Sequence, residues 1–181
     1  MPDDVSVTTA KTEDLSASVR ESITALCMAA FDEPDFLNLF TYVPSGGMHF
    51  LAYRGGELVS HAMLTTRWLQ PPDLGVLKTG WVDAVGTAPA FQGRGHGSIV
   101  MRCLAEYAAG VYAIGGLQTD IPGFYARLGW EEWRGPLAGR SKDGLVPTPT
   151  QTGVMILRLP RTPALDLDTQ LTIECQTERI W

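Results

Sequence analysis

The sequence predicts a mixed α/β protein in which a mostly antiparallel sheet is flanked by helices. Segments with helical periodicity alternate with strand-like segments, two of which flank a Gly-Gly pair, and a glycine-rich turn connects one strand to a helix. A chain of 181 residues can bury a core large enough to fold without disulfides or a structural metal, so we expect one domain spanning residues 1–181.

The expected elements follow from periodicity and turn residues in chain order. Alternation over 5–9 indicates an opening strand, and a stripe of 3.6-residue period indicates a helix over 16–31, capped by Ser16. Gly55-Gly56 between two β-rich runs indicates a hairpin. The other expected strands are 49–53, 58–68, 76–87, 111–117, 154–159 and 171–175, and the other helices are 98–109 and 122–128. We interpret 36–40 as a short helix or ordered loop, and 135–153 as a long loop.

The net charge of −6 excludes some partners and leaves one question open. Acidic residues outnumber basic ones by 20 to 14, so neither nucleic acid nor an anionic membrane is expected as a main partner. The first 40 residues hold eight acidic and two basic residues, and therefore the whole net charge. This excess is either a solvated acidic face or, in part, the lining of a site for a cation.

The spacing of cysteines and histidines predicts no metal. The cysteines lie far apart at Cys27, Cys103 and Cys175, which suggests neither a disulfide framework nor a thiolate zinc site. The histidines are scattered at His49, His61 and His96, without metal-ligand spacing to another histidine or cysteine. The acidic N-terminus and the lack of a long apolar run favour a cytoplasmic protein.

The segment Gln92-Gly-Arg-Gly-His-Gly-Ser98 is the most informative part of the chain. Glycines before a helix N-terminus favour phosphate binding, because open backbone and unpaired N–H groups face the anion. The segment lacks both the Gly-Lys-Ser/Thr of a P-loop and the Gly-x-Gly-x-x-Gly of a dinucleotide site. It resembles the pyrophosphate loop of the GCN5-related N-acetyltransferases, Gln/Arg-x-x-Gly-x-Gly; the alternative is a glycine-rich structural turn.

A second motif, Phe124-Tyr125-Ala-Arg-Leu-Gly129-Trp130, resembles the Tyr-x-x-x-Gly-aromatic segment of the same superfamily. The resemblance implies the fold of that superfamily and acetyl-CoA as the cosubstrate, with the Tyr125 hydroxyl near the CoA sulfur as the acid. The alternative is that Tyr125 only packs its ring. The cofactor-binding residues that the resemblance implies are Val85, Gly86, Thr87, Gln92, Gly93, Arg94, Gly95, His96, Gly97 and Ser98.

The chain as a whole resembles the aminoglycoside 2'-N-acetyltransferases. The resemblance rests on Gly46-Gly47-Met48-His49, on Gly80-Trp81-Val82-Asp83, where the family usually has Glu for the last residue, and on the C-terminal Trp181. It implies transfer of acetyl to the 2'-amino group of an aminoglycoside antibiotic, hence resistance, and a possible homodimer. It also implies that the base, acting through water, is Asp83 or the Trp181 carboxylate at the tip of a C-terminal strand, and that the Val85 N–H faces the oxyanion.

Two departures from this family point to a less cationic acceptor. The loop 147–153 lacks the family's usual acids, and Arg179 stands where the family has Asp. We therefore expect a low-charge aminoglycoside such as kasugamycin, whose acidic group Arg179 or Arg94 could meet. The expected substrate-binding residues are Asp32, Asp35, Asp83, Gln118, Glu178 and Trp181. The alternatives are an aminoglycoside of the kanamycin or gentamicin type, a protein or metabolite amine, and a non-catalytic CoA-binding module.

Overall fold

The structure, a computed structural model, describes residues 5–177 and 179–181 and divides into two compact units. The first unit comprises the residues up to Thr65 together with Val82–Glu106, and the second comprises Thr66–Trp81 together with Tyr107–Trp181. Helices and a mixed, mostly antiparallel sheet confirm the predicted fold class. The single domain over residues 1–181 stays a prediction.

In the first unit, β2 (Met48–Arg54) pairs antiparallel with β1 (Val5–Lys11) on one side and with the first part of β3 (Glu57–Gln70) on the other. Gly55 and Gly56 connect β2 to β3 with φ angles of +58° and +85°, the left-handed conformations that a tight hairpin turn requires. The predicted hairpin is therefore confirmed.

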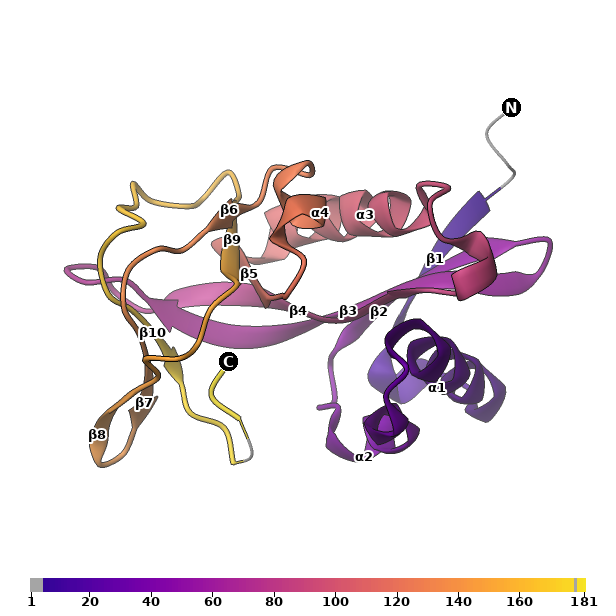
Figure 1. Cartoon of the computed structure of the whole chain (residues 1–181), viewed down its shortest axis with the longest axis horizontal. Helices are drawn as coiled ribbons and strands as arrows, with labels where there is room; N and C mark the ends of the chain where they lie inside the picture. Colours follow the sequence, from indigo (N-terminus) through magenta and orange to yellow (C-terminus); the bar gives the residue numbers. More distant parts are fainter. Residues whose placement is uncertain (1–4, 178) are drawn as a thin grey trace. The chain divides into compact units, whose positions relative to one another are not determined.

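The helical layer of the first unit covers one face of β2 and β3 (Figure 1). A 3-10 turn, η1 (Thr12–Asp14), leads to α1 (Ala17–Phe31), where the Ser16 side chain accepts a hydrogen bond of 3.3 Å from Val19 N as predicted for its cap. Its apolar stripe, Ile23, Leu26 and Cys27, is buried. The 36–40 segment is the 3-10 turn η2 (Pro34–Asn38) running into the short helix α2 (Leu39–Tyr42).

The glycine-rich segment follows β4 (Leu77–Thr87) and the 3-10 turn η3 (Pro89–Phe91). It leads into α3 (His96–Val111), which begins two residues before the expected start. Ala84 within β4 has a φ of +51°, a conformation that non-glycine residues rarely adopt. This irregularity lies beside Asp83 and Val85, two of the predicted site residues.

The second unit is an eight-strand arrangement in the order β6-β9-β5-β4-β3-β10-β7-β8. Its further elements are β5 (Ile114–Gln118), α4 (Pro122–Ala126), β6 (Glu131–Glu132), β7 (Leu137–Ser141), β8 (Gly144–Pro147), β9 (Val154–Arg158) and β10 (Leu171–Glu174). β10 pairs parallel to β7 and antiparallel to β3, so the sheet is mixed. Gly116 lies under Trp81, since a Cβ there would come within 2.8 Å of the indole ring.

Two sequence-based expectations about the second unit are wrong. The segment 135–153 is not one long loop, because it contains the β7–β8 hairpin. Its glycines and polar residues hide the strand pattern, and pairing with β10 supplies the order that local sequence does not signal. The C-terminal carboxylate is also not at the tip of a strand, because β10 ends at Glu174, seven residues before the end of the chain. In the described part of the chain, no helix has the length and apolar character needed to cross a membrane.

Candidate active site

In the first unit, side chains of α1 and the hydroxyl of Ser60 hold the end of β4 in place. Gly86 faces α1 so closely that a Cβ there would lie 3.0 Å from Leu26 and 3.3 Å from Ala30. Ser60 Oγ donates to the Gly86 carbonyl at 3.0 Å and lies 2.9 Å from the Thr87 hydroxyl. These contacts fix the strand segment that holds the predicted cofactor-binding residues Val85, Gly86 and Thr87.

The glycine-rich loop has the open backbone that an anion site requires. Gly93 and Gly95 have φ angles of +72° and +85°, and a Cβ at either would meet nothing within 4 Å. Gln92 Nε2 donates to the Thr87 carbonyl at 3.1 Å, which ties the loop to the end of β4. The exposed Arg94 guanidinium lies 5.8 Å from the Phe91 ring centroid. The loop therefore fits a diphosphate at the N-terminal end of a 16-residue helix.

His96, the first residue of α3, contributes to this loop in a way that the sequence did not indicate. Its side chain is buried, and its ring lies 6.1 Å from that of Phe91. Neither ring nitrogen has a hydrogen-bond partner within the described residues. Because both ring nitrogens are buried, any contact of His96 with a phosphate would come from its backbone N–H.

The first unit also brings together two histidines that the sequence suggested were scattered. His49 Nδ1 and His61 Nε2 are 2.9 Å apart, and both side chains are fully buried. A regular register from the Gly55-Gly56 turn would place the two side chains on opposite faces of the hairpin, and the register shift between Ala52 and Tyr53 brings them to one face. Their chain of contacts reaches the Ala84 carbonyl, next to Asp83.

The predicted acid, Tyr125, lies on α4 in the second unit. The residue is buried, and its ring packs edge-on against Phe124 and Trp130 with centroids 4.9 Å and 6.2 Å away. Burial raises the pKa of the Tyr125 hydroxyl to about 12, so the group keeps its proton at neutral pH. A protonated hydroxyl is the state that proton donation to a thiolate requires.

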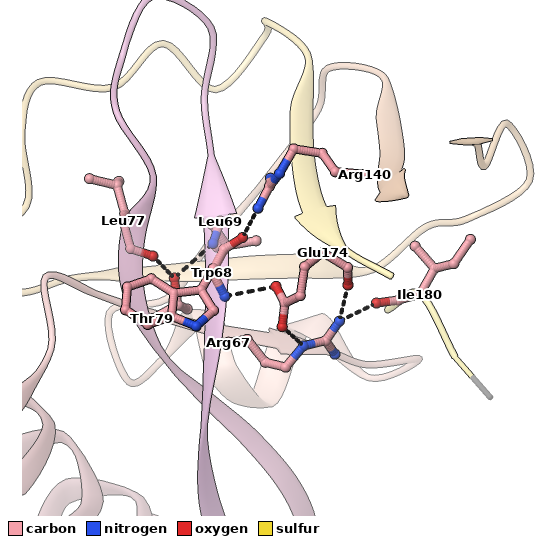
Figure 2. A network of polar contacts seen from close by, with 8 residues as sticks. All are labelled: Arg67, Trp68, Leu69, Leu77, Thr79, Arg140, Glu174 and Ile180. Atoms are coloured by element: carbon pink, nitrogen blue, oxygen red, sulfur yellow. Dashed lines mark hydrogen bonds and ion pairs between the residues drawn. The ribbon is translucent and has the colours of Figure 1, made fainter. Parts of the chain in front are cut away.

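The C-terminal segment of the second unit is held by a buried arginine (Figure 2). Arg67 Nη2 donates to the carbonyl oxygens of Glu174 and Ile180, each at 2.7 Å, and Arg67 Nε donates to Glu174 Oε1 at 2.6 Å. The side chain of Arg67 is 1% exposed. Trp181 Nε1 donates to Thr148 Oγ1 at 3.0 Å, and the Trp181 ring centroid lies 6.2 Å from that of Trp81.

A pocket of about 450 Å³ lies beside the segment that accepts this indole hydrogen bond. It is lined by Arg134, Gly135, Pro136, Leu137, Pro147, Thr148, Pro149, Gln151 and Gln170. Arg134 is the charged residue of this lining, and its guanidinium forms a two-point ion pair with Asp168 at 2.6 Å and 2.8 Å. The pocket lining therefore contains two side-chain amides, one hydroxyl, three proline rings and one guanidinium, and no carboxylate.

Three of the other predicted substrate-binding residues have exposed side chains. Asp32 and Asp35 are exposed, and Asp32 ends α1 in a left-handed conformation with φ +53°. Gln118, the last residue of β5, is exposed and donates to the Thr152 carbonyl at 3.4 Å. Glu178 lies outside the described residues.

Comparison with known proteins identifies the family. A family model described as "Acetyltransferase (GNAT) family" matches residues 16–130, which include both motifs. The chain belongs to this family. An aminoglycoside 2'-N-acetyltransferase from Mycolicibacterium fortuitum is 30% identical to this GNAT chain over 167 residues, which cover 91% of this chain and 85% of the relative. The resemblance on which the sequence analysis relied is thereby confirmed.

Solved structures agree on the GNAT fold. Eis1 from Mycobacterium abscessus matches with a TM-score of 0.61 and 19% identity, covering 74% of this chain and 32% of Eis1. ElaA from Escherichia coli matches with a TM-score of 0.60 and 17% identity, covering 85% of this chain and 99% of ElaA. At these identities the two matches support the fold alone.

Membership of the GNAT family gives the predicted cosubstrate its basis. GNAT acetyltransferases use acetyl-CoA and an acceptor that bears an amine. Within residues 5–177 and 179–181 no group of three or more His, Cys, Asp or Glu side chains could hold a metal ion, and the absence of a metal stays a prediction.

The two units divide the predicted site residues of this GNAT chain between them. The first unit contains Asp83, Val85, Gly86, Thr87 and the loop 92–98, together with Asp32 at the end of α1 and Asp35 in η2. The second unit carries Gln118, Tyr125 and Trp181. The catalytic and binding roles of all these residues stay predictions.

Proposed function

We propose that the protein transfers acetyl from acetyl-CoA to the 2'-amino group of an aminoglycoside antibiotic and thereby confers resistance. The observation that carries this proposal is the 30% identity to an aminoglycoside 2'-N-acetyltransferase over 91% of the chain. The GNAT motifs alone would support only the transfer of an acetyl group to some amine.

The loop 92–98 would hold the diphosphate of acetyl-CoA. Support comes from the left-handed, unobstructed Gly93 and Gly95, from the N-terminal end of α3 and from the exposed Arg94. The backbone groups of Val85 and Thr87 would pair with the pantetheine arm in the manner of an added strand. Acetyl-CoA supplies the acetyl group as an activated thioester.

Three roles at the reacting atoms would fall to groups of this chain: a base, an oxyanion donor and an acid. The half-buried Asp83 carboxylate or the Trp181 carboxylate would take the amine proton through a water molecule. The Val85 N–H would donate a hydrogen bond to the oxygen on which negative charge develops. The Tyr125 hydroxyl would protonate the leaving thiolate, since it carries its proton at neutral pH.

The preferred acceptor would be an aminoglycoside of low charge, such as kasugamycin. The sequence 147–153 carries no acid, and the pocket beside it has Arg134 as its charged lining residue. A polycationic drug would lose several charge-assisted contacts here, each worth about 1.5–3 kcal/mol. The half-buried Arg179 adds a positive group that an acidic substituent could meet.

Two other acceptor classes and a non-catalytic role are the alternatives to this proposal. The exposed Asp32 and Asp35 favour a cation, which suits a kanamycin- or gentamicin-type drug as well as a basic protein or metabolite amine. A non-catalytic CoA-binding module would keep the loop but would not need Asp83 or a protonated Tyr125.

Release of CoA thiol from acetyl-CoA tests the proposal. The panel should contain kasugamycin, kanamycin, gentamicin, a lysine-containing peptide and small amines. We expect turnover with aminoglycosides and the highest kcat/KM with kasugamycin. Faster acetylation of kanamycin or gentamicin would overturn the preference, and turnover of the peptide alone would overturn the aminoglycoside assignment. Stabilisation by acetyl-CoA with no thiol release would favour the binding module.

A charge-reversal pair tests the contribution of Arg179. Arg179→Asp restores the acid that the family usually has there, so kcat/KM for kanamycin should rise relative to that for kasugamycin. Lys142→Asp, at an exposed position between β7 and β8, makes the same charge change and should leave the ratio unaltered.

Homodimer formation, which the family resemblance implies, is tested separately by light scattering on the same samples.

A further inference from the structure

A continuous chain of buried hydrogen bonds connects η1 to the irregular point of β4 in the first unit. Thr12 Oγ1 lies 3.0 Å from His49 Nε2, His49 Nδ1 lies 2.9 Å from His61 Nε2, and His61 Nδ1 lies 2.8 Å from the carbonyl oxygen of Ala84. The Thr12 residue is 6% exposed, and both histidines are 0% exposed. Buried polar groups destabilise a protein unless they are hydrogen-bonded, and here each of the three side chains has a hydrogen-bond partner.

The acceptor at one end of the chain determines the direction of every hydrogen bond. A carbonyl oxygen can only accept, so His61 Nδ1 carries the hydrogen that is donated to Ala84. A neutral His61 then has an unprotonated Nε2, which accepts from His49 Nδ1–H. A neutral His49 then has an unprotonated Nε2, which accepts from the Thr12 hydroxyl at 3.0 Å. The Gly47 carbonyl lies 3.2 Å from the same hydroxyl, but it already accepts the Thr12 backbone N–H at 2.8 Å. The Thr12 hydroxyl is therefore the first donor and the Ala84 carbonyl the last acceptor.

The surroundings keep both rings neutral, as this direction requires. Burial lowers the pKa of His61 to about 3, and burial together with the nearby Arg20 guanidinium lowers the pKa of His49 to about 4. Arg20 is itself anchored, because its Nη2 donates to the Thr12 carbonyl at 2.6 Å and its guanidinium lies 5.0 Å from the Phe40 ring centroid. At neutral pH the chain therefore has one arrangement of protons.

The last acceptor belongs to the peptide group whose N–H is the expected oxyanion donor. The Ala84–Val85 peptide bond is planar and trans, so its C=O and the Val85 N–H point in opposite directions. A hydrogen bond that fixes the Ala84 carbonyl also fixes the direction of the Val85 N–H. The same bond withdraws electron density from the amide, which makes the N–H a stronger donor. Ala84 has a φ of +51°, so the peptide group needs such support to keep this orientation.

We propose that Thr12, His49 and His61 are positioning residues for acetyl transfer, holding the Ala84 carbonyl so that the Val85 N–H is aimed and polarised toward the reacting oxygen. This inference rests on the proposed function, because it assigns the Val85 N–H a role in acetyl transfer. None of the three side chains needs to touch either substrate.

Two substitutions at His61 separate the hydrogen bond from the bulk of the ring. Asn places an amide N–H near the position of Nδ1, so His61→Asn keeps a donor for Ala84, whereas His61→Leu removes it. We expect His61→Leu to lower kcat about 10- to 100-fold with KM for acetyl-CoA changed less than about 2-fold, and His61→Asn to recover most of kcat. Ile23→Val, a small change in the buried stripe of α1, controls for loss of stability alone and should leave kcat unaltered.

The far end of the chain offers a milder test for the case in which His61→Leu does not fold. Thr12→Val removes the hydroxyl at nearly constant volume, so His49 Nε2 loses its donor and the His49 ring is held less firmly beside His61. We expect a fall in kcat of about 3-fold, with Thr12→Ser, which keeps the hydroxyl, at the wild-type value.

A spectroscopic measurement reports on the amide without any turnover. Ala84-Val85 is the single Ala-Val pair in the sequence, so carbonyl-¹³C-alanine with ¹⁵N-valine labelling isolates one amide signal. Loss of the hydrogen bond to Ala84 returns electron density to the amide nitrogen, so the ¹⁵N shift of Val85 should move upfield in His61→Leu and much less in His61→Asn.

The two readouts separate failure of this inference from failure of the proposed function. Wild-type protein without any acetyl transfer would overturn the proposed function, and the Val85 shift would still report whether the histidines hold the amide. Active wild-type protein with an unchanged kcat in folded His61→Leu and Thr12→Val would overturn the inference. A kcat loss without a change in the Val85 signal would also overturn it.

Discussion

Arg67 Nη2 donates a hydrogen bond of 2.7 Å to the carbonyl oxygen of Ile180, the residue before the C-terminal Trp181. The same nitrogen donates to the Glu174 carbonyl, so one buried guanidinium holds the chain where β10 ends and again next to the terminus. The guanidinium also lies 5.6 Å from the Trp81 ring centroid. Arg67 therefore anchors, within the second unit, the segment that carries Trp181.

Arg67→Met should destabilise the protein and loosen this segment. The substitution removes the guanidinium from Glu174 Oε1, while Oε2 keeps the Trp68 N–H, and the Glu174 side chain is 29% exposed. We therefore expect the free energy of unfolding to fall by about 2–3 kcal/mol in urea denaturation. Arg134→Met breaks an ion pair with Asp168 in which both side chains are more than half exposed, and should cost less than about 1 kcal/mol. Equal losses in the two variants would contradict the assignment of Arg67 as an anchor.

Gly95→Ala should impair both stability and acetyl-CoA binding. Gly95 has a φ of +85°, so alanine costs about 1–2 kcal/mol of backbone strain, and its methyl group occupies the space expected for the diphosphate. We expect KM for acetyl-CoA to rise at least about 10-fold. Gly110→Ala lies inside α3 with open space around it and should instead stabilise the protein by about 0.5–1 kcal/mol without changing KM. Thermal melting and initial rates measure both effects.

The sequence predicted those parts of the fold and site that depend on local pattern. The Gly55-Gly56 turn required left-handed backbone, and the 3.6-residue stripe of α1 had an apolar core to face, so both were predicted correctly. Gly93 and Gly95 have left-handed backbone and open space around them, which agrees with the open glycine turn expected from the sequence, while their role in binding CoA stays a prediction.

The missed features depend on contacts between distant segments. The β7–β8 hairpin owes its order to parallel pairing with β10, which is more than thirty residues away. The His49–His61 contact depends on the register of the β2–β3 hairpin, and the anchoring of Ile180 by Arg67 joins residues 113 positions apart. No local periodicity encodes such a pairing, so the histidines looked scattered in the sequence. The strand-tip carboxylate was an implication of the family resemblance, and β10 ends before it.

Tyr125→Phe should reduce kcat while leaving the fold intact. Removing one hydroxyl from a ring packed against Phe124 and Trp130 changes little packing, whereas loss of the acid should lower kcat about 100-fold. KM for acetyl-CoA and the melting temperature should stay close to the wild-type values. An unchanged kcat would mean that Tyr125 has a packing role alone.

The His49–His61 pair should make the protein sensitive to acid. In the unfolded chain a histidine titrates near pH 6.5, whereas the folded pKa values are about 4 for His49 and about 3 for His61. Below pH 6.5 the unfolded state therefore binds protons that the folded state does not, so stability is present above that pH and is lost as the pH falls toward 4 and 3. Each histidine contributes a slope of up to about 1.4 kcal/mol per pH unit within that window.

Urea unfolding of the wild type and of His61→Asn between pH 7.5 and 4.5 measures this slope. Carboxylates titrate in both proteins, so the difference between the two curves isolates the histidine. We expect the free energy of unfolding of His61→Asn to fall less steeply with acid by about 1 kcal/mol per pH unit. Parallel curves would mean that His61 accepts a proton in the folded state near pH 6, and that the hydrogen bonds from Thr12 to Ala84 do not run in the single direction that two neutral rings impose.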